Sequence, residues 1–122
     1  MRAVDIIQSP YLHTYYKSHF VKVTLDSGAT TSLVKASFVK NIGIHIEPST
    51  QHGAEQADGE TPLRIRGEVH FKLTRNSRTF QLDALVVDKL DTDVLVGMPL
   101  LTKNDIAIRP AKRQIVIQGK EG

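Results

Sequence analysis

The run over residues 21–30, VKVTLDSGAT, constrains this chain more than any other stretch. Apolar and polar side chains alternate up to Leu25, and a period of two is the pattern of a half-buried strand. The strand ends at Asp26, and Gly28 then allows a sharp turn and a close approach of another molecule. We expect burial at the end of an apolar strand to raise the pKa of the Asp26 carboxyl, which suits acid–base chemistry. On this tripeptide alone, a turn in which Asp26 hydrogen-bonds its own backbone is the simpler interpretation.

The composition limits the classes of protein to consider. With 122 residues, 40% of them hydrophobic, the chain is predicted to be a single domain over residues 1–122 with a frayed tail at 119–122. No apolar run approaches the ~20 residues of a membrane-spanning helix, so we expect no membrane partner. The lack of cysteine excludes disulfides and thiolate metal sites. The net charge of +3 is scattered without interleaved aromatic residues, so nucleic-acid binding is not expected as the main role.

Strand and helix signals follow one another along the first part of the chain. Residues 1–8 predict a short edge strand, and residues 11–16 and 19–25 predict a hairpin. Beyond the acidic loop, apolar residues at four-residue spacing predict a helix over residues 34–42, with Thr31 or Ser32 as its N-cap and Gly43 as its stop. Residues 44–46 are expected to be extended.

A polar stretch over residues 49–62 contains two glycines and no large apolar side chain. A loop of this length in a compact domain is more often functional than idle. One interpretation is a hairpin that projects from the domain and closes over a cleft, with its tip at Ala57, Asp58 and Gly59. The alternative is a solvated loop without a function.

Strands resume in the second half of the chain. Alternating apolar side chains predict strands over residues 68–74 and 80–86, joined by a hairpin loop. Residues 94–96 form a continuous apolar run that meets a glycine, as expected of a fully buried strand. A short helix over residues 98–104 and a closing hairpin over residues 106–118 follow. The order predicts an all-β domain, a closed barrel with one or two short helices.

With these elements placed, the chain resembles the retropepsins, the single-domain aspartic proteases of retroviruses and long-terminal-repeat retrotransposons. Residues 25–29, LDSGA, are similar to the catalytic loop of that family. A glycine-containing hairpin follows about one flap's distance downstream, and residues 95–97, LVG, are similar to the family's apolar-apolar-glycine strand. The resemblance covers roughly residues 11–118. It implies a retropepsin-like closed β-barrel with a flap hairpin, encoded in a Gag-Pol-type polyprotein.

Two departures from the family's pattern stand out. Retroviral members usually carry an Asp after the catalytic glycine, paired with an Arg after the second glycine, and here those positions hold Thr30 and Met98. Loss of both partners can be nearly neutral, whereas loss of one leaves a buried charge without its partner. The absence of both partners indicates a closer resemblance to the retrotransposon-type and cellular members of the family than to the retroviral ones. The expected flap also carries Glu55, Asp58 and Glu60 in place of an apolar tip, which leaves its boundaries and the substrate preference open.

The resemblance implies a chemistry that needs two carboxylates, whereas the chain has one Asp-Ser-Gly loop. It therefore implies a symmetric homodimer in which each protomer contributes one Asp26. One carboxylate, ionised, would act as a general base on a water molecule, and the other, protonated, would donate to the developing oxyanion. Ser27 and Gly28 would support the loop. The residues implied in binding a polypeptide substrate are Ala29, Ala57, Asp58, Gly59, Leu95 and Val96, although Leu95 and Val96 could equally be ordinary core residues.

No cofactor and no metal are expected. The five histidines lack the spacing of metal ligands and have no cysteine partners. By the resemblance, the substrate would be the chain's own Gag-Pol-type polyprotein. Cleavage would take place in the cytoplasm or within virus-like particles, after release from the polyprotein.

Two further functions remain open at this point. The polar flap and the missing ion pair are compatible with a catalytically inactive retropepsin fold that serves as a dimerisation or peptide-binding module. The mildly basic charge is compatible with a β-barrel that binds nucleic acid, in which case the affinity would fall steeply with salt.

Overall fold

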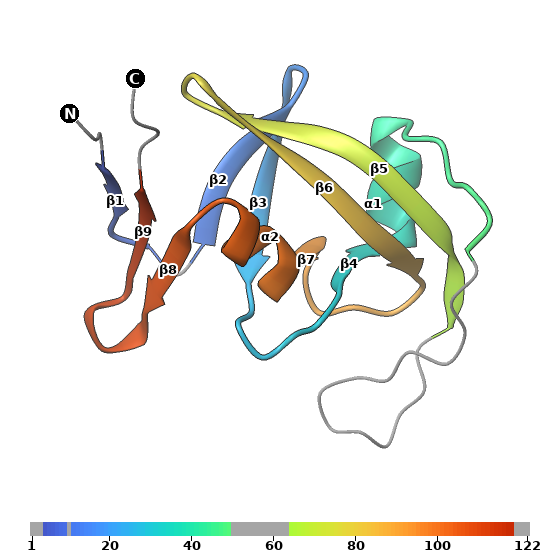
Figure 1. Cartoon of the computed structure of the whole chain (residues 1–122). Coiled ribbons are helices and arrows are strands. Elements are labelled where there is room, and N and C mark those ends of the chain that lie inside the picture. Colours follow the sequence, from blue (N-terminus) through green and yellow to red (C-terminus); the bar gives the residue numbers. More distant parts are fainter. Residues whose placement is uncertain (1–3, 10, 50–63, 119–122) are drawn as a thin grey trace.

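The computed structural model describes residues 4–9, 11–49 and 64–118, which contain nine strands, two α-helices and one 3-10 helix (Figure 1). The strands are β1 (Val4–Ile7), β2 (Tyr11–Tyr16), β3 (His19–Leu25), β4 (Ser32–Lys35), β5 (Ile65–Arg75), β6 (Arg78–Val87), β7 (Val94–Val96), β8 (Ile106–Arg109) and β9 (Gln114–Gln118). The helices are α1 (Ala36–Ile42), α2 (Met98–Lys103) and the 3-10 turn η1 (Pro110–Lys112). None of the described helices is long and apolar enough to cross a membrane. The expected flap tip at Ala57, Asp58 and Gly59 and the expected tail at 119–122 lie outside the described residues.

Six strands close into a barrel in the order β2-β3-β7-β4-β6-β5. The long antiparallel hairpin of β5 and β6 runs across the molecule in Figure 1. Pairing of Tyr15 in β2 with Thr74 in β5 closes the barrel, and the Thr74 hydroxyl donates to the Tyr15 carbonyl at 3.3 Å. The prediction of an all-β closed barrel with short helices is confirmed.

Alternate side chains of the barrel strands fill its interior. Val21 and Val23 of β3, Val94 and Val96 of β7 and Leu82 of β6 are each at most 1% exposed. Successive residues of a strand point to opposite faces, so the alternation visible in the sequence decides which face is buried.

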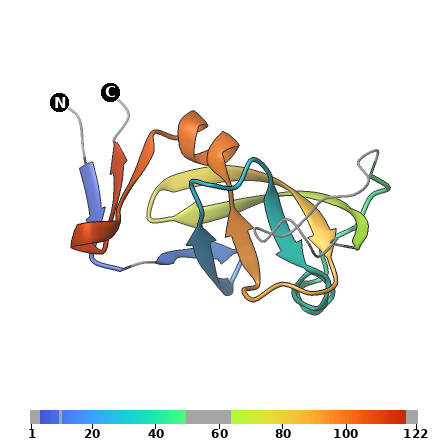
Figure 2. The same ribbon diagram turned by 90° about the horizontal axis from the view of Figure 1, so that it is seen from below.

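Strand β7 lies between β3 and β4, parallel to β3 and antiparallel to β4 (Figure 2). Since β3 and β4 run in opposite directions on its two sides, the connection over residues 26–31 crosses the end of β7. The acidic loop and Gly97, which follows β7, are therefore neighbours although they are far apart in the sequence.

The predicted helix over residues 34–42 begins too early. Ser32–Lys35 forms β4, and α1 begins only at Ala36. Val34 is fully buried and is paired with Val86 of β6 and Val94 of β7. Strand pairing on both sides outweighs the four-residue apolar spacing that predicted a helical Val34, because tertiary packing overrides local propensity.

A second sheet, of order β1-β9-β8, lies beside the barrel and carries both ends of the described chain (Figure 1). β1 and β9 are antiparallel, with Val4 opposite Gln118. β8 and β9 form the second antiparallel pair, joined through η1. The expected N-terminal edge strand and closing hairpin are both confirmed.

Gly67 allows residues 46 and 47 to approach β5 closely. Residues 44–46 are not part of a strand, but Glu47 and Glu68 exchange two backbone hydrogen bonds of 2.8 Å. Gly67 has a φ of 155°, and a Cβ atom placed there would collide with the Glu47 carbonyl oxygen and lie 2.6 Å from Cγ2 of Ile46. Only glycine fits this contact without displacing the backbone.

We expect Gly67→Ala to lower the free energy of unfolding by about 3 kcal/mol, through backbone strain and overpacking against residues 46 and 47. The matched control is Gly43→Ala, at the end of α1, where φ is also positive (75°) but a Cβ would meet no atom within 4 Å. Its cost is the backbone conformation alone, about 1 kcal/mol. Urea unfolding at a fixed protein concentration measures both values, and equal losses would contradict the close-contact explanation.

Candidate active site

Asp26 begins the connection that crosses the end of β7, and its side chain is half-buried. Its backbone N–H donates to the Val96 carbonyl at 2.8 Å, which continues the pairing of β3 with β7. The Gly28 N–H donates to Oδ1 of Asp26 at 2.9 Å. The turn in which Asp26 hydrogen-bonds its own backbone is thus present, and it fixes one carboxylate oxygen. No described donor engages the other oxygen, Oδ2.

Ser27 and Gly28 are exposed at the turn, and Ala29 is half-buried. A Cβ atom at Gly28 would lie 3.3 Å from Oδ1 of Asp26, so a side chain there would crowd the carboxylate. The Ala29 carbonyl accepts the Met98 N–H at 2.8 Å, so the loop is held at its far side as well.

A buried hydroxyl fastens the same loop to β7. The Gly97 N–H donates to Oγ of Ser32 at 3.0 Å, and Ser32 is only 4% exposed. Gly97 has no room for a side chain, because a Cβ would lie 2.7 Å from the Ala29 carbonyl oxygen. Ser32 was expected to cap a helix, but the structure uses its hydroxyl as a link between β4 and the residue after β7.

The two positions at which retropepsins usually carry an ion pair hold neutral side chains here, and both are exposed. Thr30 lies in the loop, and Met98, at the start of α2, is 41% exposed. The backbone bonds of Asp26 and Ala29 and the bond to Ser32 hold the loop to the β7–α2 junction without any charge. No buried charge is left without a partner at this place.

The two residues expected to contact substrate from β7 differ in their burial. Val96 is 1% exposed and belongs to the hydrophobic core. Leu95 is partly exposed and points to the other face, where its register partners are Thr24 of β3 and Leu33 of β4. Of the two, Leu95 is the one that a ligand beside Asp26 could contact.

A groove of about 270 Å³ opens next to the loop. It lies between α2 and β8, and its lining includes Ser27, Met98, Leu101, Ile106 and Ile108. The groove is mainly apolar and continues directly from the turn that carries Asp26.

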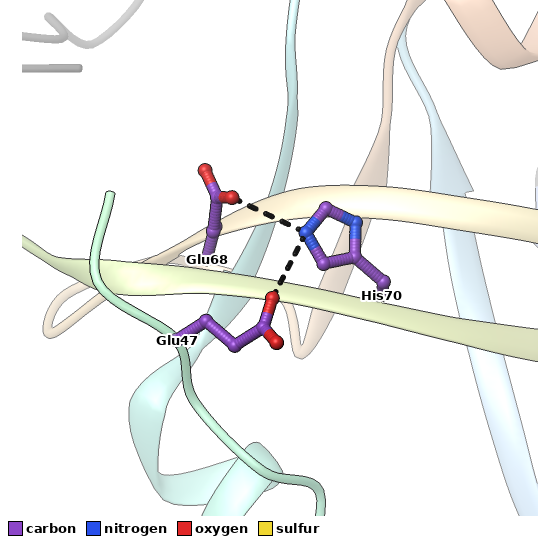
Figure 3. Close-up of side chains that lie close together, drawn as sticks. All are labelled: Glu47, Glu68 and His70. Carbon is purple, nitrogen blue, oxygen red and sulfur yellow. Dashed lines mark hydrogen bonds and ion pairs between the residues drawn. The ribbon is translucent and has the colours of Figure 1, made fainter. Parts of the chain in front are cut away.

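The fold also assembles a charged cluster that sequence spacing did not predict. Nε2 of His70 lies 3.2 Å from Oε1 of Glu68 and 3.5 Å from Oε2 of Glu47 (Figure 3). Nδ1 of His70 lies 2.8 Å from Oδ1 of Asp83, its register partner in β6. Hydrogen bonds to Asp83 and then to Glu68 raise the pKa of His70, and the hydrogen bond to His70 lowers the pKa of Asp83.

Part of this cluster was visible in the sequence. Glu68 and His70 are two residues apart on a predicted strand and therefore share a face. Glu47 joins them only through the pairing of its backbone with Glu68, which no local pattern indicates.

Comparisons with known proteins agree with the geometry. The family described as "gag-polyprotein putative aspartyl protease" matches residues 15–103. No curated protein matches the chain in sequence. Among solved structures, a retropepsin-like aspartic protease from Rickettsia conorii is similar with a TM-score of 0.70 and 17% identity, over 98% of this chain and 92% of that one.

Two further structures share the fold. The retroviral protease-like domain of Ddi1 from Leishmania major has a TM-score of 0.64 and 16% identity, over 84% of this chain and 81% of that one. The EIAV protease in complex with the inhibitor HBY-793 has a TM-score of 0.61 and 18% identity, over 78% of this chain and 86% of that one. At these identities the similarity establishes the retropepsin-like fold.

We expect Ser32→Ala to lower the free energy of unfolding by about 1–3 kcal/mol, because it leaves the buried Gly97 N–H without its acceptor. The control is Ser37→Ala, on the exposed face of α1, where the change should stay within about 0.5 kcal/mol. Ser32→Thr keeps the hydroxyl and should recover part of the loss. Urea unfolding of the three variants measures the effect, and equal stability of Ser32→Ala and Ser37→Ala would show that the bond is dispensable.

Proposed function

The chain belongs to the gag-polyprotein aspartyl protease family, and from this membership we propose that it is an aspartic endopeptidase that works as a homodimer. The observation that carries the proposal is the fixed, half-buried position of Asp26. One of its oxygens is held by Gly28, and its loop is hydrogen-bonded at both sides to the β7–α2 junction. A carboxylate that is prevented from turning is suited to act on a bound water molecule.

The homodimer is proposed because one protomer supplies one such carboxylate. In a two-fold symmetric dimer, a residue close to the axis meets its own copy, so one loop per protomer is enough for a pair of Asp26 side chains. The apolar groove beside Ser27 and the exposed Met98 lie next to this loop, and burial in an interface would remove them from water. The exposed Ser27 would face the same axis.

In the proposed mechanism the two Asp26 side chains share one proton, because two carboxylates this close cannot both ionise. The ionised one accepts a proton from water as the water oxygen attacks the scissile carbonyl. The protonated one donates to the oxygen that becomes negative. As the tetrahedral intermediate collapses, the amine leaves with the proton that the first Asp26 took from water, and a hydroxyl of the intermediate returns a proton to the other Asp26. No covalent enzyme intermediate forms.

The substrate we propose is an extended polypeptide, in the first place the chain's own Gag-Pol-type polyprotein. The family's connection with gag polyproteins and the partly exposed Leu95 beside the loop support this choice. Ala29 would contact the peptide backbone, and Ala57, Asp58 and Gly59 would cover it. We place the reaction in the cytoplasm or within virus-like particles after release from the polyprotein of a retrotransposon-type element.

We expect Asp26→Asn to lower the rate of peptide cleavage by at least about 100-fold, since the amide cannot serve as a general base. Asparagine keeps an oxygen that can accept the Gly28 N–H, so the loop should still fold. The matched control is Asp91→Asn, an exposed carboxylate in the connection before β7, which should leave the rate unchanged. The assay is cleavage of a fluorogenic peptide with apolar flanking residues between acidic and neutral pH. Turnover by Asp26→Asn at the wild-type rate would end the claim.

We expect a shared active site to show in mixed dimers. If equal amounts of wild type and Asp26→Asn are unfolded together and refolded, random pairing gives about one quarter wild-type dimers. Cleavage should then fall to about one quarter of the rate of the same total amount of wild type. An inhibitor of the statine type counts the working sites, because it mimics the transition state. Retention of one half of the activity would indicate sites that are complete within one protomer.

A further inference from the structure

The cluster around His70 lies on the exposed face of the β5–β6 hairpin and shares no residue with the Asp26 loop (Figure 3). Three separate segments supply its side chains. Glu47 precedes the undescribed residues, Glu68 and His70 lie on β5, and Asp83 lies on β6. The two backbone hydrogen bonds between Glu47 and Glu68 bring the first segment into place.

The hydrogen bond to Asp83 fixes the tautomer of neutral His70, so that Nε2, facing the two glutamates, is the acceptor nitrogen. The 2.8 Å contact between Nδ1 and Oδ1 of Asp83 has the length of a charge-assisted hydrogen bond. An ionised carboxylate can only accept, so Nδ1 carries the hydrogen. Gln81 donates to the same Asp83 oxygen at 3.1 Å and steadies it. In the neutral imidazole, the lone pair of Nε2 then points at Glu47 and Glu68.

A lone pair that faces two carboxylates needs a positive charge between them. The distances from Nε2 to the glutamate oxygens are 3.2 Å, at the long end of an N–H···O hydrogen bond, and 3.5 Å, beyond it. They are close to the separation of about 3.4 Å expected between two ligand atoms of a tetrahedral metal ion with bonds of about 2.1 Å. The three ligand atoms lie within 4.8 Å of one another, so small side-chain rotations would complete the set.

We propose that Glu47, Glu68 and His70 bind one divalent transition-metal ion, with Zn²⁺ as the best match, and that Asp83 orients the histidine. One imidazole and two carboxylates are a donor set that suits Zn²⁺. In such sites, the ligating histidine usually donates its other ring N–H to a carboxylate that does not touch the metal. The side chains of Glu47, Glu68 and His70 are 52%, 30% and 43% exposed, which leaves room for water as a fourth ligand.

Bound metal would have a mechanical consequence for this face of the barrel. It would join the segment of Glu47 to β5 through side chains, in addition to the two backbone bonds that Gly67 permits. The proposal does not depend on the proteolytic activity, because none of its residues belongs to the Asp26 loop.

Isothermal titration of the tag-free protein with Zn²⁺ tests the proposal. We expect one site per chain in the wild type, and a dissociation constant at least 10-fold higher in Glu47→Gln, Glu68→Gln and His70→Gln. Asp83→Asn should weaken binding by about 10- to 100-fold, as is usual for a residue that orients a ligand. The control is His19→Gln, an exposed histidine at the β2–β3 turn, which should bind as the wild type does.

Co²⁺ provides a second readout, because its visible absorption reports the coordination geometry. An intense tetrahedral spectrum in the wild type that is lost in His70→Gln would support the site. Far-UV circular dichroism without metal verifies that the variants are folded, as expected for exposed side chains. Equal Zn²⁺ affinity in the wild type and His70→Gln, or no binding in the wild type, would overturn the proposal. The cluster would then be an ion-pair network around a protonated His70.

Discussion

The position of Asp26 depends on one arrangement, in which the connection from β3 to β4 is hydrogen-bonded across the end of β7. Asp26 donates to Val96, Met98 donates to Ala29, and Gly97 donates to the buried hydroxyl of Ser32. These bonds are 2.8–3.0 Å long, and the bond to Ser32 is buried, so the geometry of the loop tolerates little displacement. The barrel, with its core of alternating valines and leucines, keeps β3, β7 and β4 in the register that this arrangement requires.

The same arrangement explains how the loop remains ordered without the ion pair that retroviral relatives carry near it. The attraction within a buried ion pair must offset the free energy of removing two charges from water. Loss of one partner is therefore strongly destabilising. Here Thr30 and Met98 take its place, and neutral bonds to backbone atoms and one serine hydroxyl hold the loop.

How much the sequence could predict depended on the range of the interactions concerned. Alternation within a strand is local, so the hairpins, β7 and the closed barrel were predicted from it, as was the Asp26 turn. Val34 was assigned to a helix because its strand partners, Val86 and Val94, are distant in the sequence. The approach of Glu47 to His70 likewise arises from long-range pairing that Gly67 permits, and no periodic pattern in the sequence predicts it.

The pairing of β1 with β9 has a consequence for the connectivity of the chain. Val4 lies opposite Gln118 in neighbouring strands, so the two ends of the described chain are about 5 Å apart. The polypeptide therefore runs almost as a ring. Joining these ends by a short linker and opening the ring at the tight Asn76–Ser77 turn between β5 and β6 would give a circular permutant with every strand pair retained. In such a permutant, the same barrel would form from strands synthesised in a different order.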